Sequence, residues 1–244
     1  MTPATGAPAP ALVLFDIDGT LIRRAGPHHR EALVEAVRRV TRAEATTENI
    51  PVQGMLDRDI LRLMLLKAGF GMVEIRRMMP DLVREAQSAY ARACPDLRSK
   101  VSPGARDLLA ELKRRGVPAG LVTGNLTRIG WKKMERAGLK RFFRFGAFAE
   151  RATTRAGLAS WAVRYARRQG WIAPESRVSL VGDHENDIRA ARAAGIQAVA
   201  VATGLTSRRT WPPARPTSCC PIFSRYNWRW CCSSPPAWKP NRSP

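Results

Sequence analysis

Carboxylates follow two apolar segments of this chain, at the point where each segment ends. Asp16 and Asp18 come after residues 12–15, and Asp183 and Asp187 come after residues 177–182. If both segments are strands of one parallel sheet, their carboxyl ends meet at the edge where open α/β sheets bind ligands. Four carboxylates gathered there repel one another unless a hard cation neutralises them, and a small set of oxygen ligands favours Mg²⁺ with bound water. These four residues are our candidate metal ligands.

Uncharged and basic residues are expected at the same edge. Another short apolar segment, residues 119–122, ends in the polar set Thr123, Gly124 and Asn125. Arg155 opens a helical pattern and supplies a cation. His184 lies next to the acidic group, but a lone histidine among carboxylates does not make a zinc site. Neither GxxxxGK[ST] nor GxGxxG occurs, so no nucleotide-binding loop is predicted.

The elements around these residues alternate between strand and helix. Besides the three apolar segments, residues 198–204 have the pattern of a fourth strand. Helical patterns cover residues 104–115, 127–137, 155–169 and 187–194. This alternation predicts an α/β fold, with a Rossmann-like parallel sheet and helices on both faces.

A helical block interrupts the alternation after the first strand. Apolar residues recur at helical spacing in residues 29–40, 57–68 and 73–93, with expected breaks at Gly69, Gly71 and Pro80. We predict an inserted α-helical cap domain at residues 24–98 and a catalytic core at residues 1–23 and 99–204.

Residues 205–244 differ from the rest of the chain. They contain no Asp or Glu but hold four of the five Cys and four of the seven Trp, without helical or alternating periodicity. Their adjacent cysteines fit a tetrahedral zinc site poorly, and a disulfide framework is not expected in a cytosolic enzyme. We interpret the segment as an atypical tail, either frameshifted or disordered. One codon set for residues 216–223, CCG ACT TCC TGC TGC CCG ATC TTT, read two bases later, encodes Asp-Phe-Leu-Leu-Pro-Asp-Leu, which resembles a buried strand.

Length and charge limit the function classes. The 244 residues suit one domain, or one domain with a smaller insertion. The formal net charge is +21, but the basic residues are spread along the chain and Arg outnumbers Lys 34 to 7, so no nucleic-acid partner is predicted. No apolar run approaches the roughly 20 residues of a membrane helix. The first ten residues lack the features of a signal peptide, so we expect a cytoplasmic protein without a membrane partner.

In their order along the chain, these motifs resemble those of the haloacid dehalogenase-like (HAD) hydrolase superfamily. The likeness spans residues 12–204 and rests on Phe15-Asp-Ile-Asp-Gly-Thr20, Leu121-Val-Thr-Gly-Asn125, a basic residue, and Leu180-Val-Gly-Asp-His-Glu-Asn-Asp187. It implies a phosphoglycolate-phosphatase-like member with a helical cap.

The resemblance implies catalytic roles for residues that match the motifs. Asp16 would be the nucleophile that forms an aspartyl-phosphate. Asp18 would act as general acid and then as general base, and an Asp at this position indicates a phosphatase or phosphomutase. Thr123 would hydrogen-bond the phosphoryl group beside Gly124 and Asn125. Arg155 would neutralise the charge of that group.

The resemblance also implies the metal ligands. Asp16, the backbone carbonyl of Asp18, and Asp183 would hold Mg²⁺. Asp187 would support the metal shell or position Arg155, and capping a helix is an alternative role for it.

Two positions depart from the family pattern. The basic residue is usually Lys, whereas Arg155 stands here, with Lys132 and Lys133 as alternatives on the preceding helix. A guanidinium offers two parallel donors where an ammonium is a point charge. His184 replaces the more usual Thr or Ser, which leaves open the contacts around the metal ligands.

We therefore expect Mg²⁺-dependent hydrolysis of a small phosphomonoester. The cap segment Gly54-Met-Leu-Asp-Arg58 is our candidate for substrate selection, and Arg58 would pair with an acidic substrate such as phosphoglycolate. One alternative is a phosphomutase that shares the first half-reaction. Another is an inactive, destabilised product whose altered C-terminus lacks a final edge strand and helix. The sequence leaves the oligomeric state open.

Overall fold

The core of the protein is a parallel sheet. The computed structural model describes residues 7–203 and the backbone of residues 218–220. Its six strands lie in the order β3-β2-β1-β4-β5-β6, and every pairing is parallel. The strands are β1 (Ala9–Phe15), β2 (Ala119–Val122), β3 (Phe143–Ala147), β4 (Ile172–Gly182), β5 (Gln197–Val201) and β6 (Ser218–Cys220).

Strand β1 lies in the middle of the sheet, where the chain order reverses. Residues 11–15 are all buried, as expected of a strand that is covered on both faces. Phe15 pairs with Leu121 of β2 on one side and with Val181 of β4 on the other. The carboxyl ends of these three strands therefore share one edge, at the switch point where ligands bind in such sheets.

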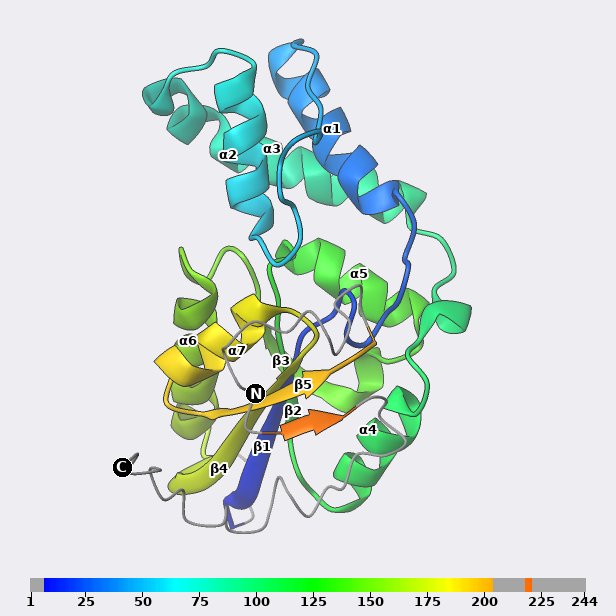
Figure 1. The fold of residues 1–244 in the computed structure, drawn as a ribbon, viewed down its shortest axis with the longest axis vertical. Helices are drawn as coiled ribbons and strands as arrows, with labels where there is room; N and C mark the ends of the chain where they lie inside the picture. Colours follow the sequence, from blue (N-terminus) through cyan, green and yellow to red (C-terminus); the bar gives the residue numbers. More distant parts are fainter. Residues whose placement is uncertain (1–6, 204–217, 221–244) are drawn as a thin grey trace, which may run out of the picture.

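Helices cover both faces of the sheet. Figure 1 shows α6 (Arg155–Arg168) and α7 (Glu185–Ala193) on one face, and α4 (Ala105–Arg114) and α5 (Thr127–Arg136) on the other. Each helix buries one apolar side; α4, for example, buries Leu108, Leu109 and Leu112. The predicted α/β fold is confirmed. None of the described helices is long and apolar enough to cross a membrane.

Three further helices stand above the carboxyl ends of the strands, and we call residues 24–98, which contain them, the cap. They are α1 (His28–Thr41), α2 (Asp57–Lys67) and α3 (Met72–Ala93). The two linkers between cap and core run side by side (Figure 1), because the backbone N–H of Arg23 donates to the carbonyl of Lys100 at 2.8 Å. An antiparallel bridge between Ile22 and Val101 continues this contact.

The expected break at Pro80 is wrong, because α3 runs through this residue without interruption. A proline inside a helix removes one backbone hydrogen bond. Pro80 is exposed, so the carbonyl group left without that bond lies on the solvent side of the helix. The opposite side buries a continuous apolar row, which outweighs the lost bond: Ile75, Met79, Leu82, Ala86, Ala89 and Tyr90.

Two strands were not predicted. Strand β3 forms one edge of the sheet, and its buried residues alternate with more exposed ones, Phe143 and Phe145 facing inward and Arg144 outward. Strand β6 comes from the tail and pairs with β5 from Val199 to Val201. Residues 218–220 therefore form a strand at this edge, where the alternative of a destabilised product supposed that an edge strand is lost. The frameshift and disorder hypotheses otherwise concern residues outside the described part of the chain.

Candidate active site

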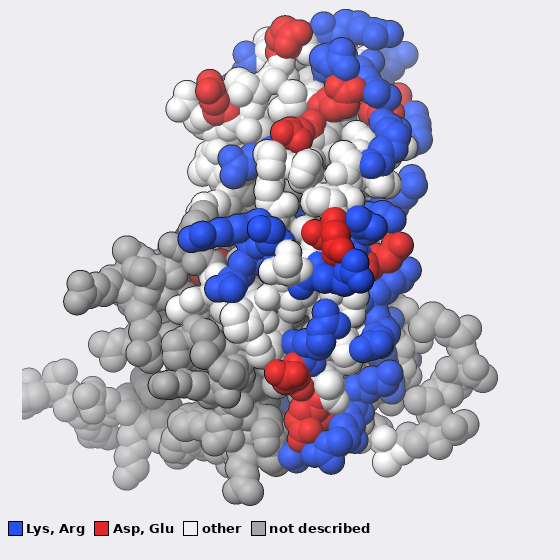
Figure 2. All heavy atoms as spheres, turned by 90° about the vertical axis from the view of Figure 1, so that its right-hand side faces the viewer, with Lys and Arg blue, Asp and Glu red and all other residues white. Residues whose placement is uncertain are grey.

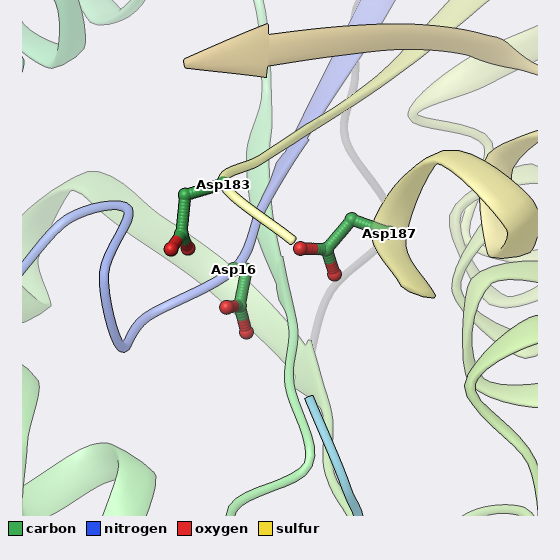
Figure 3. A group of neighbouring side chains, drawn as sticks. All are labelled: Asp16, Asp183 and Asp187. Carbon is green, nitrogen blue, oxygen red and sulfur yellow. The ribbon is translucent and has the colours of Figure 1, made fainter. Parts of the chain in front are cut away.

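Three buried carboxyl groups meet at the switch point of the sheet. Asp16 follows β1 directly, Asp183 follows β4 directly, and Asp187 lies in the first turn of α7. Figure 3 shows the three side chains gathered around one small space. One oxygen of each lies within 4.8 Å of the others. The sequence analysis predicted that these three acids meet at one edge of the sheet, and in the structure they lie together at that edge.

The environment of these acids disfavours their charged forms. Burial, together with the negative charge of Asp187, raises the pKa of Asp183 to about 7. Burial also raises the pKa of Asp16 well above its usual value, although the positive charge of Arg155 opposes this shift. A divalent cation would remove the repulsion that the shared site creates.

The donor set fits Mg²⁺. Oδ1 of Asp16 is buried and lies 2.7 Å from the Arg155 guanidinium, yet no described residue donates a well-aligned hydrogen bond to it. The side-chain atoms of the three acids that could bind a metal ion are all carboxylate oxygens, the ligands that Mg²⁺ prefers. The turn at Gly19, with a φ of +82°, brings the backbone against Asp183, and a Cβ there would lie 2.2 Å from a carboxylate oxygen. The hydroxyl of Thr20 orients Asp183 by donating to it at 2.8 Å.

Arg155 bridges two of the three acids. It opens α6, whose N-cap is Thr154, and its guanidinium is buried. Nε and Nη2 donate to Oδ1 of Asp187 at 2.9 and 2.6 Å, and Nη2 also lies 2.7 Å from Asp16. Asp187 accepts a bond from the backbone N–H of His184 as well, in the capping box of α7. Asp187 thus positions Arg155, one of the roles considered for it. It is not the N-cap of α7, which is His184, but the third residue of the helix, whose side chain completes the capping box.

Asp18 stands apart from this group and contacts a different cation. Both of its carboxylate oxygens accept from Nζ of Lys133 at 2.7 Å, and Nδ2 of Asn125 donates to it at 2.7 Å. Burial would raise its pKa, but the charge and hydrogen bond of Lys133 dominate and lower it to about 2. Asp18 is therefore ionised at neutral pH. The other lysine considered from the sequence, Lys132, pairs with Glu135 on the outer side of α5.

The loop after β2 supplies the remaining polar groups. Thr123 is buried, and its hydroxyl accepts from Nδ2 of Asn125 at 2.7 Å. The amide of Asn125 is fully engaged, since its oxygen accepts from Lys133 at 2.6 Å. All three residues of the Thr123–Asn125 segment line the same cavity as Asp16.

The cap is seated on this loop through backbone contacts. The backbone N–H of Asp57 donates to the carbonyl of Gly124, and its carboxylate accepts from the backbone N–H of Leu126, both at 2.8 Å. His29 of α1 holds the same carboxylate at 2.9 Å. A cavity of about 870 Å³ lies between cap and core, and its lining includes Asp16, Asp18, Asp183, Arg155 and Lys133.

Some site residues differ from the sequence analysis. Arg58 is exposed and is not among the residues that line the cavity, so the structure does not bring it to the acids. Lys133, one of the alternatives for the basic residue, and His29, which was not a candidate, both line the cavity. Both lie on the side of their helix that carries the buried apolar residues. A polar residue at such a position is the feature of the sequence that could have identified them as site residues.

Comparison with known proteins agrees with this geometry. The family model for haloacid dehalogenase-like hydrolases matches residues 10–195. Phosphoglycolate phosphatase 1 of Pseudomonas aeruginosa is 28% identical over 210 residues, covering 85% of this chain and 75% of its own length. Phosphoglycolate phosphatase of Synechococcus elongatus is 27% identical over 216 residues, covering 84% and 89%.

Solved structures share the fold. A β-phosphoglucomutase from Clostridium difficile has a TM-score of 0.63 at 17% identity and covers 90% of this chain and 94% of its own. A protein from Haemophilus somnus, described as a predicted phosphoglycolate phosphatase, has a TM-score of 0.62 at 18% identity and covers 88% and 96%.

The chain belongs to the haloacid dehalogenase-like hydrolase family. It is an enzyme, a hydrolase that acts on phosphoric monoesters, and it is similar to phosphoglycolate phosphatases.

Proposed function

We propose that the protein is a Mg²⁺-dependent phosphatase that hydrolyses a small acidic phosphomonoester through an aspartyl-phosphate on Asp16. The observation that carries this proposal is the position of Asp16, buried at the end of β1 beside two further acids and 2.7 Å from Arg155. A carboxylate held between like charges and one guanidinium is poised to attack phosphorus while the cation neutralises the phosphoryl oxygens.

Asp18 is the proposed acid and base. Because Lys133 keeps it ionised, this arrangement suits the second half-reaction, in which Asp18 takes a proton from the water that attacks phosphorus. In the first half-reaction the leaving alcohol needs a proton, so Asp18 must be protonated before it can act there. Thr123 lines the cavity, and its hydroxyl is the proposed hydrogen-bond donor to the phosphoryl group.

Mg²⁺ would be held by Asp16, Asp183 and the backbone carbonyl of Asp18. When bound, the ion would neutralise charge on the transferring phosphoryl group. Asp187 supports this site from the side through its bond to Arg155.

The cavity rim favours an anionic substrate. Figure 2 shows Lys and Arg gathered on the side of the molecule where both linkers run. Four exposed cations line the cavity from this region and have no acidic partner in the described part of the chain: Arg23, Arg24, Arg30 and Lys100. The names of the curated relatives point the same way, since phosphoglycolate carries a carboxylate besides its phosphate. We predict a cytoplasmic location, which cell fractionation would test.

Phosphate release from a panel of phosphomonoesters, including 2-phosphoglycolate, tests the proposal with and without Mg²⁺. We expect release only with the metal, and a loss on the order of 10³-fold or more in Asp16→Asn. Asp59→Asn is the matched control, because Asp59 lies on α2 and pairs with Arg62 outside the cavity. Equal rates for Asp16→Asn and the unaltered chain would contradict the proposal.

A phosphomutase is the second candidate, because a solved β-phosphoglucomutase shares the fold. Isomerisation of a sugar phosphate without net release of phosphate would favour it over hydrolysis.

A further inference from the structure

His184 is the N-cap of α7, and this role determines where its ring carries a proton. The backbone N–H of Asn186 donates to Nδ1 of His184 at 3.2 Å. Because a backbone N–H only donates, Nδ1 is the acceptor of this bond, so it carries no hydrogen and the ring is neutral. The one ring proton therefore lies on Nε2, which makes Nε2 a hydrogen-bond donor.

The ring of His184 is packed against the cap. Its Nδ1–Cε1 edge lies at the backbone of Gly54, where a Cβ would be 2.5 Å from Nδ1 and 2.9 Å from Cε1. Nδ2 of Asn186 donates to the carbonyl of Gly54 at 3.0 Å and keeps the two segments in contact. Gly54 has a φ of +67°, so both its conformation and this contact require glycine. The ring is thus held by the helix end below it and by the cap backbone.

The second nitrogen of the ring is free to bind a ligand. His184 is half-buried and lines the cavity. None of the described residues forms a hydrogen bond with its Nε2, whereas Nδ1 is occupied by the helix end. Nε2 is not among the sealed polar atoms that lack a partner, so a ligand can reach it. An oriented donor without a protein partner therefore belongs to the cavity lining.

The place of His184 indicates which part of a substrate it meets. In the proposed function the phosphoryl group binds Asp16 and Thr123, which follow β1 and β2. The cap stands above these strand ends (Figure 1), and His184 follows β4 and contacts Gly54 of the cap. The leaving group of a bound ester has to occupy the space between the phosphoryl group and the cap. A donor at the contact between core and cap therefore faces the leaving group.

We propose that Nε2–H of His184 binds an acceptor oxygen of the leaving group and that His184 is a specificity-determining residue. It selects phosphomonoesters whose leaving group carries a carboxylate or hydroxyl oxygen near the ester bond. The rim cations attract negative charge, whereas this neutral donor requires an oxygen at one position. The Thr or Ser that is more usual here also caps a helix but has no second polar atom at this distance from the backbone. This inference rests on the proposed phosphatase function.

Two substitutions separate the two nitrogens of the ring. His184→Thr keeps an oxygen that caps the helix and removes the distal donor, whereas His184→Gln keeps a distal N–H donor and caps poorly. We expect the melting temperature to stay within about 1 °C in His184→Thr and to fall by about 2–4 °C in His184→Gln. The same two substitutions at His28, which pairs with Glu31 outside the cavity, are the matched controls and should keep the activity of the unaltered chain.

Specificity is measured as kcat/KM for 2-phosphoglycolate divided by kcat/KM for ethyl phosphate, whose leaving group has no oxygen besides that of the ester. We expect this ratio to fall about 10-fold in His184→Thr and less than about threefold in His184→Gln, because a bond from a neutral donor to a carboxylate is strong. For 2-hydroxyethyl phosphate, whose acceptor is uncharged, the fall in His184→Thr should be about threefold. An unchanged ratio in His184→Thr, or equal falls in both variants, would overturn the proposal.

Nitrogen-15 NMR of the histidine rings gives a readout that needs no turnover. The chain has three histidines, so substitution of each assigns the signals. In Asp16→Asn, His184 should carry its proton on Nε2, and 2-phosphoglycolate should shift the Nε2 signal more than ethyl phosphate does. A proton on Nδ1, or equal shifts with the two ligands, would overturn the inference. A chain that hydrolyses no phosphomonoester would refute the proposed function and leave this measurement intact.

Discussion

Gly124 of the core lies directly beneath the carbonyl oxygen of Met55 in the cap. A Cβ on Gly124 would lie 2.1 Å from that oxygen, far inside van der Waals contact. The neighbouring bond from the N–H of Asp57 to the carbonyl of Gly124 fixes the same approach. The seat of the cap is therefore a backbone-to-backbone contact that tolerates no side chain.

Gly124→Ala should lift the cap segment from the core. We expect KM for the phosphomonoester to rise about 10-fold or more, because misplacement by about 1 Å weakens positioning. The melting temperature should change little, since the core sheet is untouched. Gly71→Ala, which meets only the flexible end of Glu74, is the control. Steady-state kinetics of both variants check this, and an unchanged KM in Gly124→Ala would contradict it.

The acids at the sheet edge should make stability depend on pH and metal. The pKa of Asp183 rises from 3.8 to about 7 on folding. A raised carboxyl pKa stabilises the fold fully below the unfolded value, and this contribution is lost as pH rises through the folded value. Without metal, the protein should melt at a lower temperature at pH 8 than at pH 5.

Mg²⁺ should oppose the loss of stability at high pH, because it binds the ionised form of the acids. The increase in melting temperature on adding Mg²⁺ should be larger at pH 8 than at pH 5. Asp183→Asn should weaken both effects. Thermal melts at the two pH values, with and without metal, make the comparison. An equal effect of Mg²⁺ at both would refute the assignment of these acids to a cation.

Removal of the Arg155 guanidinium should destabilise the site. Breaking one side of a buried ion pair costs about 3–5 kcal/mol. We expect Arg155→Met to lower the free energy of unfolding by about this amount and to lose most activity. Arg155→Lys keeps the positive charge but cannot bridge Asp16 and Asp187. We therefore expect this variant to keep more of the stability than of the activity of the unaltered chain. Arg164→Met, exposed on the same helix, is the control in urea denaturation.

The rim cations should recognise the second anionic group of the substrate. Arg23→Ala combined with Lys100→Ala should raise KM for 2-phosphoglycolate by about 10-fold. KM for ethyl phosphate, which lacks the carboxylate, should stay the same. Arg58→Ala should affect neither substrate, because Arg58 lies outside the cavity lining. A change in KM for 2-phosphoglycolate in Arg58→Ala alone would restore the sequence-based assignment.

The strand-end acids were predictable because their position follows from local pattern alone. Asp16 and Asp183 each end an apolar segment, and a parallel sheet forces such ends together. Strand β3 was also visible in the sequence, since Phe143, Phe145 and Ala147 alternate with less apolar residues. It was missed because the segment is short and follows a helical turn.

The bonds between cap and core could not be predicted in the same way. His29, Asp57 and Lys133 lie on three different helices, and no spacing along the chain relates them. Their meeting depends on how the cap is seated, which tertiary packing determines. The sign of these contacts in the sequence is weak: a lysine and a histidine occupy helix positions whose neighbours on the same face are apolar.

The adjoining linkers have a topological consequence. Ile22 and Val101 are bridged, and the N–H of Arg23 meets the carbonyl of Lys100, so the chain leaves and re-enters the sheet domain at one point. A tight turn of a few residues could join these ends and close a capless chain without disturbing any strand. The helical unit is thus inserted at a single point of the sheet domain, and the strands that carry the acids do not need it for their connection.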